Sequence, residues 1–260
     1  MQNSQSYRYA MRLAFHGSPF SGWQFQPEQK TVQGELNIAL KSLLREDVKI
    51  VGAGRTDTGV HALNYVAHFD SSKIIDPVEI VSRLNRFLPN KISIYEIIKV
   101  NSTFHARFSA VSRAYSYSIR HRKFAFGNDM IWDYRRDMDY SLLHKCAASL
   151  LKAKDFSAFA RSGSDNTNMI CQIRHATWVQ QDDNLTFQIK ANRFLRNMVR
   201  SLVGTMVETA NGHRNFSDWE SLLLGGERAE SGNSAPANGL IFMGVSYPKS
   251  PFNEREVAKY

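Results

Sequence analysis

The sequence lacks the features that mark several large classes of protein. No apolar run is long enough to span a membrane. Residues 1–6 are polar and lack the basic and apolar regions of a signal peptide. The only cysteines are Cys146 and Cys171, and with no Cys-x-x-Cys pair neither a disulfide nor a zinc site is expected. These absences predict a cytoplasmic protein that does not contact membranes.

Motifs for nucleotides and metals are also missing. There is no Gly-Lys-Ser or Gly-Lys-Thr, which excludes the phosphate-binding loop of nucleotide hydrolases. Gly52-x-Gly54 precedes a strand-like pattern, whereas a dinucleotide-binding loop precedes a helix. The eight histidines are scattered, and none forms a His-x-x-x-His pair. We therefore expect neither a metal nor a cofactor.

Acidic residues are fewer than basic ones. Lys and Arg number 33 against 24 Asp and Glu, which gives a formal net charge of +9. This excess favours a polyanionic partner, although a basic surface that serves only solubility gives the same count. The 43% hydrophobic content is ordinary for a globular protein.

Hydrophobic periodicity predicts an α+β fold in which the order β-α-β-β-α-β occurs twice. The first half has strands at 7–15, 48–51, 62–69 and 91–100, and helices that begin at Thr31 and Asp76. The second has strands at 112–121, 169–179, 185–191 and 240–247, and helices capped at Asp139, Asn192 and, in a short addition, Ser217. We predict two ferredoxin-like halves, residues 1–103 and 104–260, each with an antiparallel sheet and both helices on one face.

The loop between the second and third strands is the first candidate for chemistry. It reads Gly-Arg-Thr-Asp-Thr-Gly-Val-His over residues 54–61, more than a hairpin needs. Glycines permit positive φ and close approach of another molecule, so the loop is suited to present Asp57 at a cleft. A structural turn built on Asp57 is the plain alternative.

A second motif, Phe-His-Ala-Arg-Phe-Ser at residues 104–109, precedes the strand that carries Arg113, Tyr115 and Tyr117. Residues two apart share one face of a strand, so this face is both aromatic and basic. Such a face suits nucleic acid, where rings stack on bases and arginines meet phosphates. A tyrosine buried against a helix is the competing interpretation.

A third motif surrounds the helix predicted from residue 194. Arg193, Arg196 and Arg200 have helical spacing that brings them near one face, and two of them lie at the positive end of the helix dipole. That placement indicates an anionic partner, with a solvated basic face as the alternative. Farther along, Ser162-Gly163-Ser164, Asn166 and Asn168 are typical of a mobile loop, which would serve either as a clamp on a nucleic acid or as flexible linkage.

The three motifs, with Ala-Pro-Ala-Asn-Gly-Leu at 235–240, resemble the signatures of the tRNA pseudouridine synthase A family, in the family's order. Thr58 stands where an alanine is usual. The resemblance implies two halves with joined sheets around a central basic cleft for tRNA, and a homodimer. It also implies that Tyr115 stacks on the target uracil and that Arg200 pairs with a catalytic Asp57.

The expected activity is isomerisation of uridine to pseudouridine at positions 38 to 40 of tRNA. We expect Asp57, Tyr115 and Arg200 to be catalytic, with Asp57 acting on either the sugar or the base ring. The residues expected to bind substrate are Arg55, Thr56, His61, Phe104, His105, Arg107, Arg113, Arg193, Arg196, Gly239 and Leu240. The alternatives are a non-catalytic RNA-binding protein and a metal-dependent nuclease that uses Asp57 and His61.

Overall fold

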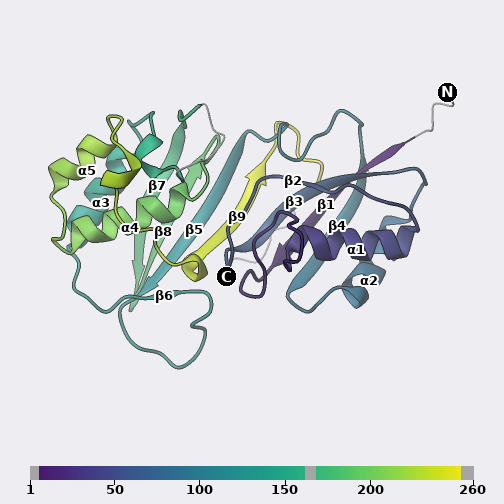
Figure 1. Ribbon diagram of the computed structural model, residues 1–260, viewed down its shortest axis with the longest axis horizontal. Coiled ribbons are helices and arrows are strands. Elements are labelled where there is room, and N and C mark those ends of the chain that lie inside the picture. Colours follow the sequence, from purple (N-terminus) through teal and green to yellow (C-terminus); the bar gives the residue numbers. More distant parts are fainter. Residues whose placement is uncertain (1–5, 162–167, 253–260) are drawn as a thin grey trace. The chain divides into compact units, whose positions relative to one another are not determined.

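The computed structural model describes residues 6–161 and 168–252 (Figure 1). The chain forms two compact units, Met1–Val111 with Phe242–Tyr260 as unit 1 and Ser112–Ile241 as unit 2. Both units combine helices with mostly antiparallel strands. The loop predicted around 162–167 lies outside the described residues.

Unit 1 follows the order of elements that the sequence predicts. Its sheet has the strand order β4-β1-β3, with the short β2 paired to β3, and every pairing is antiparallel. The helix α1 lies in front of these strands in Figure 1. The elements are β1 (Tyr7–Phe15), α1 (Val32–Leu44), β2 (Val51–Gly52), β3 (His61–Ser71), α2 (Pro77–Phe87) and β4 (Ile92–Val100).

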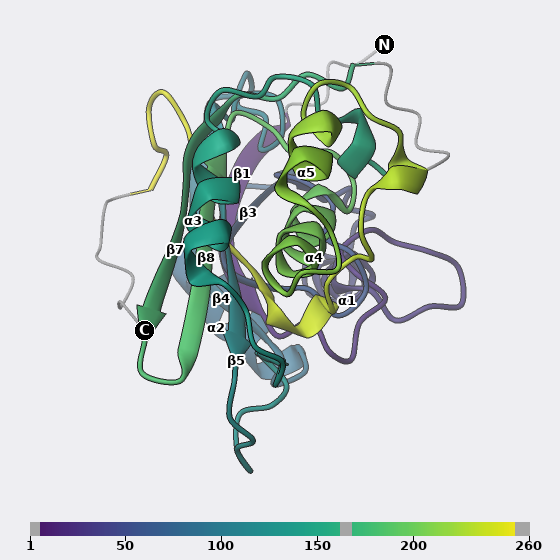
Figure 2. The same ribbon diagram turned by 90° about the vertical axis from the view of Figure 1, so that its left-hand side faces the viewer.

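Unit 2 is built on the strand order β5-β8-β7, with the short β6 parallel to β5. Figure 2 shows α3, α4 and α5 together on one side of β7 and β8. The elements are β5 (Ser112–Arg120), β6 (Trp132–Asp133), α3 (Tyr140–Ser149), β7 (Ile173–Gln181), β8 (Asn184–Ala191), α4 (Met198–Ala210) and α5 (Phe216–Leu222). Short 3-10 turns lie at Ser157–Phe159, Arg228–Glu230 and Ala237–Gly239, and β9 (Leu240–Ser246) leads the chain back to unit 1.

Three helices begin where the sequence predicts. The Thr31 hydroxyl accepts the N–H of Gly34, and the carboxylates of Asp76 and Asp139 accept N–H groups from the first turns of α2 and α3. These caps satisfy backbone donors that have no partner within the helix. In the described residues, no helix has the length and apolar character needed to cross a membrane.

Two predicted helix starts are wrong. The helix expected from residue 194 begins at Met198, because Asn197 adopts a left-handed conformation with φ of 66°. Asn192, the predicted cap, instead accepts the N–H groups of Gln172 and Arg193, both at 2.8 Å, and so shapes a loop. Arg193 and Arg196 therefore precede α4 and do not share a helix face with Arg200.

The second error concerns α5. Its capping box is formed by Asn215 and Asp218, and Ser217 lies inside the helix. The Asn215 N–H donates to the Asp218 carboxylate at 3.2 Å. Asparagine and serine are comparable caps, so the sequence alone did not separate two starts only two residues apart.

Candidate active site

The loop that carries Asp57 joins β2 to β3 in unit 1. Val60 donates its N–H to the Asp57 carbonyl at 3.1 Å, and Gly59 has a φ of 81°, so residues 57–60 form a tight turn. Arg55 is exposed and Asp57 partly exposed, whereas Thr56 between them is buried. Thr56 Oγ1 has no hydrogen-bond partner among the described residues.

The segment before α1 packs closely along this loop. Trp23 donates its N–H to the Thr56 carbonyl at 3.3 Å. A Cβ at Gly17 would lie 2.1 Å from the Val60 carbonyl oxygen, and one at Gly22 would lie 2.4 Å from that of Thr56. Gly22 also has a φ of 85°. Only glycine fits at these two positions, so backbone contact restrains the loop along its length.

His61, at the start of β3, is buried. Its Nδ1 accepts the Gly17 N–H at 3.1 Å, and its ring lies edge-on to His16 with centroids 4.3 Å apart. The side chain of His61 therefore helps to hold the glycine-containing segment against the loop.

An arginine on β1 organises the second motif. Arg8 donates to the carbonyls of Ser102 and Phe104 at 2.7 and 2.9 Å. It also donates twice to Asp70, both at 2.7 Å. Hydrogen bonding from Arg8 lowers the pKa of Asp70. This bidentate pair anchors the turn that leads into residues 104–109.

His68 of β3 holds the same turn at a second point. Its Nδ1 accepts the Ala106 N–H at 3.1 Å, while the Tyr247 hydroxyl donates to the Ala106 carbonyl at 2.8 Å. Burial, with the nearby positive charge of Arg8, lowers the pKa of His68 to about 4. The imidazole is therefore neutral near pH 7 and able to accept this hydrogen bond.

The held turn presents a ring and a cation to solvent. His105 Nδ1 accepts the N–H groups of Arg107 and Phe108, both at 3.2 Å. Phe108 is 76% exposed. The Arg107 guanidinium lies 5.4 Å from the centroid of the Phe108 ring. Burial lowers the pKa of His105, which favours the neutral ring that accepts these bonds.

In unit 2, Arg113 and Tyr115 lie on β5 beside the loop that precedes α4. Arg113 donates to the Asn192 carbonyl at 2.9 Å. The Tyr115 ring meets that of Phe194 edge-on, with centroids 5.1 Å apart. The structure thus brings Tyr115 and the 192–197 loop, with Arg193 and Arg196, to one place on unit 2.

Arg200 lies in the first turn of α4 and contacts the segment that follows the turn at 228–230. Its Nε donates to the Ala235 carbonyl at 2.7 Å, and the Ala235 N–H donates to the Arg200 carbonyl at 2.9 Å. These reciprocal bonds fix both the side chain and the backbone of Arg200 to the backbone of residue 235.

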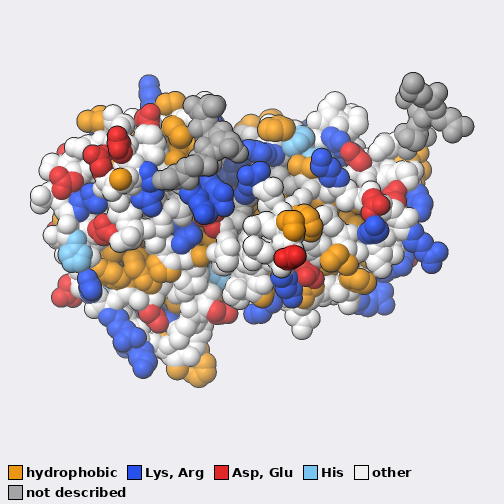
Figure 3. Space-filling view, in the orientation of Figure 1, with side chains coloured by type: hydrophobic (Ala, Val, Ile, Leu, Met, Phe, Trp, Pro, Cys, Tyr) orange, Lys and Arg blue, Asp and Glu red, His pale blue; other side chains and the backbone are white. Residues whose placement is uncertain are grey.

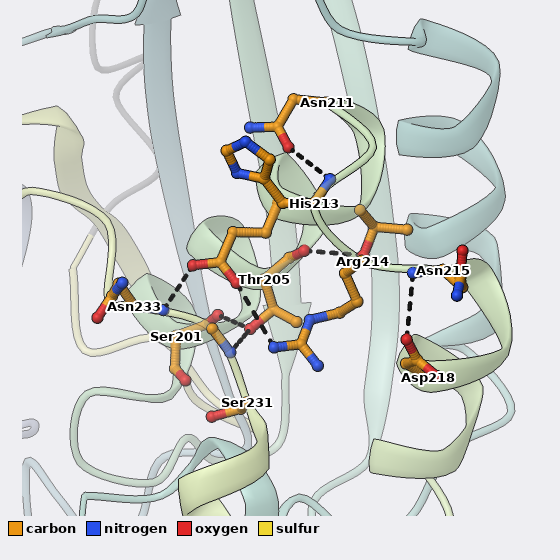
Figure 4. Close-up of polar contacts among 12 residues, drawn as sticks. Ser201, Thr205, Asn211, His213, Arg214, Asn215, Asp218, Ser231 and Asn233 are labelled. Atoms are coloured by element: carbon orange, nitrogen blue, oxygen red, sulfur yellow. Dashed lines mark hydrogen bonds and ion pairs between the residues drawn. The ribbon is translucent and has the colours of Figure 1, made fainter.

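The rest of that segment runs along α4 (Figure 4). The Thr205 hydroxyl accepts the Gly232 N–H at 3.0 Å, and the Glu208 carboxylate accepts the Asn233 N–H at 2.9 Å. A Cβ at Gly204 would lie 1.8 Å from the Asn233 carbonyl oxygen. The helix therefore holds residues 232–235 by three polar side chains and one close backbone contact.

Gly239 and Leu240 follow directly. The Tyr117 hydroxyl donates to the Pro236 carbonyl at 2.8 Å, and a Cβ at Gly239 would lie 2.7 Å from the Tyr117 ring. Burial raises the pKa of Tyr117, so its hydroxyl stays protonated and continues to donate. Gly239 is thus required for the 235–240 segment to cover this ring.

Comparison with known proteins identifies the family in which these segments occur. A family model described as tRNA pseudouridine synthase matches residues 12–109 and 147–248, which include the Asp57 loop, the 104–109 turn and the Arg200 segment. The chain belongs to the tRNA pseudouridine synthase family.

Curated relatives of this family match nearly the whole chain. A tRNA pseudouridine synthase A from Bacteroides thetaiotaomicron is 39% identical over 250 residues, covering 95% of this chain and 93% of the relative. One from Bacteroides fragilis is 39% identical, covering 94% and 98%. One from Chlorobium luteolum is 38% identical, covering 92% and 94%.

The predicted site residues are divided between the two units. Unit 1 holds Arg55, Thr56, Asp57, His61, Phe104, His105 and Arg107; unit 2 holds Arg113, Tyr115, Arg193, Arg196, Arg200, Gly239 and Leu240. Within each unit the structure joins residues far apart in sequence, as Arg200 with Ala235 and Tyr115 with Phe194.

Sequence reasoning about the family motifs missed the residues that hold them. Arg8, Tyr65 and His68 lie on strands of unit 1, and Thr205 and Glu208 lie on α4. Their positions read as ordinary strand or helix residues, and none stands in a signature motif. The buried polar side chain within an apolar strand, as at His68, was the signal available.

The surface charges and the grouping of possible metal ligands are relevant to what the protein can bind. Figure 3 shows Lys and Arg side chains on the surface of each unit. Within residues 6–161 and 168–252, no group of three or more His, Cys, Asp or Glu residues has an arrangement that would hold a metal ion.

Proposed function

We propose that this chain isomerises uridine to pseudouridine at positions 38 to 40 of tRNA. The observation that supports the activity most strongly is the family match over the Asp57 loop, together with the geometry that restrains that loop while leaving Asp57 partly exposed. The relatives that match nearly the whole chain are named tRNA pseudouridine synthase A, which makes tRNA the expected substrate.

The reaction breaks the N-glycosidic bond, turns the uracil and forms a bond from C5 to the sugar, with no net redox change. Asp57 supplies the carboxylate, which acts on the ribose or on the uracil ring. Tyr115 supplies the ring that stacks on the uracil, and Arg200 supplies the positive charge proposed to pair with this carboxylate. A paired base is out of reach, so the target nucleotide leaves its stack before reaction.

Exposure and chemistry support three members of the proposed binding set. Arg55 and Arg107 are exposed cations on the restrained segments of unit 1, and Arg196 is exposed on the loop before α4. Arginine pairs well with phosphate, and the neighbouring rings suit unpaired bases. Thr56, His61, Phe104, His105, Arg113, Arg193, Gly239 and Leu240 complete the proposed substrate-binding set.

In this proposal, residues 1–103 and residues 104–260 are two ferredoxin-like halves. The elements from β1 to β4 have the order β-α-β-β-α-β, and those from β5 to β9 follow this order with the short strand β6, the helix α5 and three 3-10 turns added. The proposal also includes a cytoplasmic homodimer, which light scattering would test: a monomer at micromolar concentration contradicts it.

One assay separates this function from its rivals. tRNA that carries tritium at uracil C5 releases it to water when the C5 glycosidic bond forms. We expect release by the protein with chelator present. Binding without release would identify a non-catalytic RNA-binding protein, and chain cleavage abolished by chelator would identify a nuclease. Replacing the uridines at 38, 39 and 40 singly tests the proposed positions.

A further inference from the structure

The hydroxyl of Tyr65 engages the backbone of the loop that carries Asp57. Tyr65 is a fully buried residue of β3. Its hydroxyl donates to the Gly54 carbonyl and accepts the Gly54 N–H, the latter at 3.2 Å. One side chain thus satisfies both polar groups of a single glycine three residues before Asp57.

The Tyr65 ring has little freedom to move. The Trp23 ring lies 4.2 Å from it between centroids, and the Phe15 ring lies 5.6 Å away. A Cβ at Gly52 would lie 2.2 Å from the Tyr65 hydroxyl oxygen, so this glycine leaves just enough room for the hydroxyl. Close packing therefore fixes where the hydroxyl can act.

Gly54, by contrast, has open space on the side where a side chain would lie, among the residues that the structure describes. A Cβ built there would meet no heavy atom of the described residues within 4 Å. Glycine has the widest backbone freedom of any residue. The two hydrogen bonds to Tyr65 therefore limit backbone rotation at Gly54, which directly precedes Arg55 and lies three residues before Asp57.

We propose that Tyr65 is a positioning residue, whose hydroxyl sets the path of the Asp57 loop and so the place of the reacting carboxylate. The inference rests on the proposed function, because it concerns the residue assigned to the chemistry. Positioning matters because a displacement of about 1 Å from a reactive geometry lowers rate by about 100-fold.

The chain offers a matched control in Tyr9. Tyr9 is also buried in unit 1, lies on β1, and accepts one backbone N–H, that of Ile75, at 3.1 Å. Its ring stacks on Phe69 with centroids 5.6 Å apart. Tyr65→Phe and Tyr9→Phe each remove one buried hydroxyl and keep the ring, but only Tyr65 bonds the catalytic loop.

The experiment measures single-turnover tritium release, tRNA affinity and thermal unfolding for both variants. We expect both to unfold a few degrees below the unmodified protein. Tyr65→Phe should release tritium about 10- to 100-fold more slowly with Kd for tRNA changed less than about threefold. Tyr9→Phe should keep the rate within about twofold.

Three results would overturn the proposal. They are an unchanged rate in Tyr65→Phe, an equal loss in Tyr9→Phe, and failure of Tyr65→Phe alone to fold, which would make the hydroxyl a requirement of the fold. Asp57→Asn in the same assay distinguishes failure of the proposed function from failure of the positioning role. An active Asp57→Asn variant refutes the proposed chemistry. An inactive Asp57→Asn variant, together with an unchanged rate in Tyr65→Phe, refutes only the positioning role.

Discussion

The segments that carry the candidate site are held differently in the two units. In unit 1, rings from β3 do this work: Tyr65 bonds Gly54 of the Asp57 loop, and His68 bonds Ala106 of the 104–109 turn. In unit 2, residues 232–235 are held by α4, through the hydroxyl of Thr205 and the carboxylate of Glu208.

The two units thus fix the position of a loop in two different ways. A buried ring is restrained by packing, so a single hydroxyl or imidazole nitrogen on it is placed accurately. Thr205 is short and is instead restrained by its helix, since its hydroxyl also donates to the Ser201 carbonyl at 2.8 Å. Unit 1 should therefore be sensitive to changes in rings and their protonation, and unit 2 to changes on one helix face.

The largest loss of stability is expected from Gly204→Ala. The new Cβ would lie 1.8 Å from the Asn233 carbonyl oxygen, a backbone atom that cannot move without shifting the segment bonded to Arg200. We expect a loss of about 3 kcal/mol in the free energy of unfolding, measured with urea, together with slower tritium release.

Gly244→Ala is the control for this change. Within the described part of the chain, a Cβ at Gly244 would come no closer than 3.6 Å to another heavy atom, so the free energy of unfolding of Gly244→Ala should change by less than about 1 kcal/mol. Equal losses in the two variants would show that the contact between α4 and residues 232–235 is not tight.

Acid should act on unit 1 through His68. Its pKa of about 4 lies below the ordinary value of 6.5, because burial and the charges of Arg8 and His105 oppose protonation more than Asp70 favours it. Between these two pH values the unfolded chain binds a proton that the folded protein does not. Stability is therefore present above pH 6.5 and is lost as pH falls toward 4. The loss is about 3 kcal/mol before solvent screening is counted and about 2 kcal/mol with it.

His68→Asn tests this origin of the acid sensitivity. The side-chain oxygen of the introduced asparagine retains an acceptor for the Ala106 N–H but does not titrate. Urea unfolding of both proteins at several pH values should show a shallower decline for the variant between pH 6.5 and 4. Parallel curves would assign the acid sensitivity to other groups, such as Asp70.

A smaller effect is expected from Thr205→Val, which keeps the shape but leaves the Gly232 N–H without its acceptor. Thr209→Val is a matched control on the same helix, because the Thr209 hydroxyl is bonded to the Thr205 carbonyl at 2.9 Å. Thr205→Val should lose about 1 kcal/mol more than Thr209→Val in urea unfolding. The comparison between the units would fail if the two losses were equal.

Local signals in the sequence were sufficient for much of the fold. The caps at Thr31, Asp76 and Asp139 stand directly before strong apolar periodicity, and the predicted strands 7–15 and 112–121 match β1 and, within one residue, β5. These elements satisfy their own backbone groups or alternate cleanly, so few distant contacts are needed to define them.

The start of α4 could not be predicted in the same way. Asn192 is a good cap in isolation, but its side chain is engaged by Gln172, a residue twenty positions earlier. The positive φ of Asn197 accompanies a hydrogen bond from its amide to Ser234 at 2.6 Å. Both are tertiary contacts, and they outweigh the local capping preference.

Motifs indicated the candidate site residues but not the residues that hold them. The glycines of the Asp57 loop are visible in the sequence, whereas the hydroxyl of Tyr65 acts on Gly54 from eleven positions away, across the loop. Likewise, nothing in the sequence of α4 distinguishes Thr205, which contacts Gly232, from Thr209 on the next turn.

The central claim is that Asp57 performs the chemistry, and Asp57→Asn tests it most directly. The variant keeps the size of the side chain and removes its charge. With enzyme in excess over tRNA tritiated at uracil C5, we predict release at least about 1000-fold slower than in the unmodified protein, with Kd for tRNA within about threefold. Release at the unmodified rate would contradict the assignment of Asp57 and the proposed mechanism.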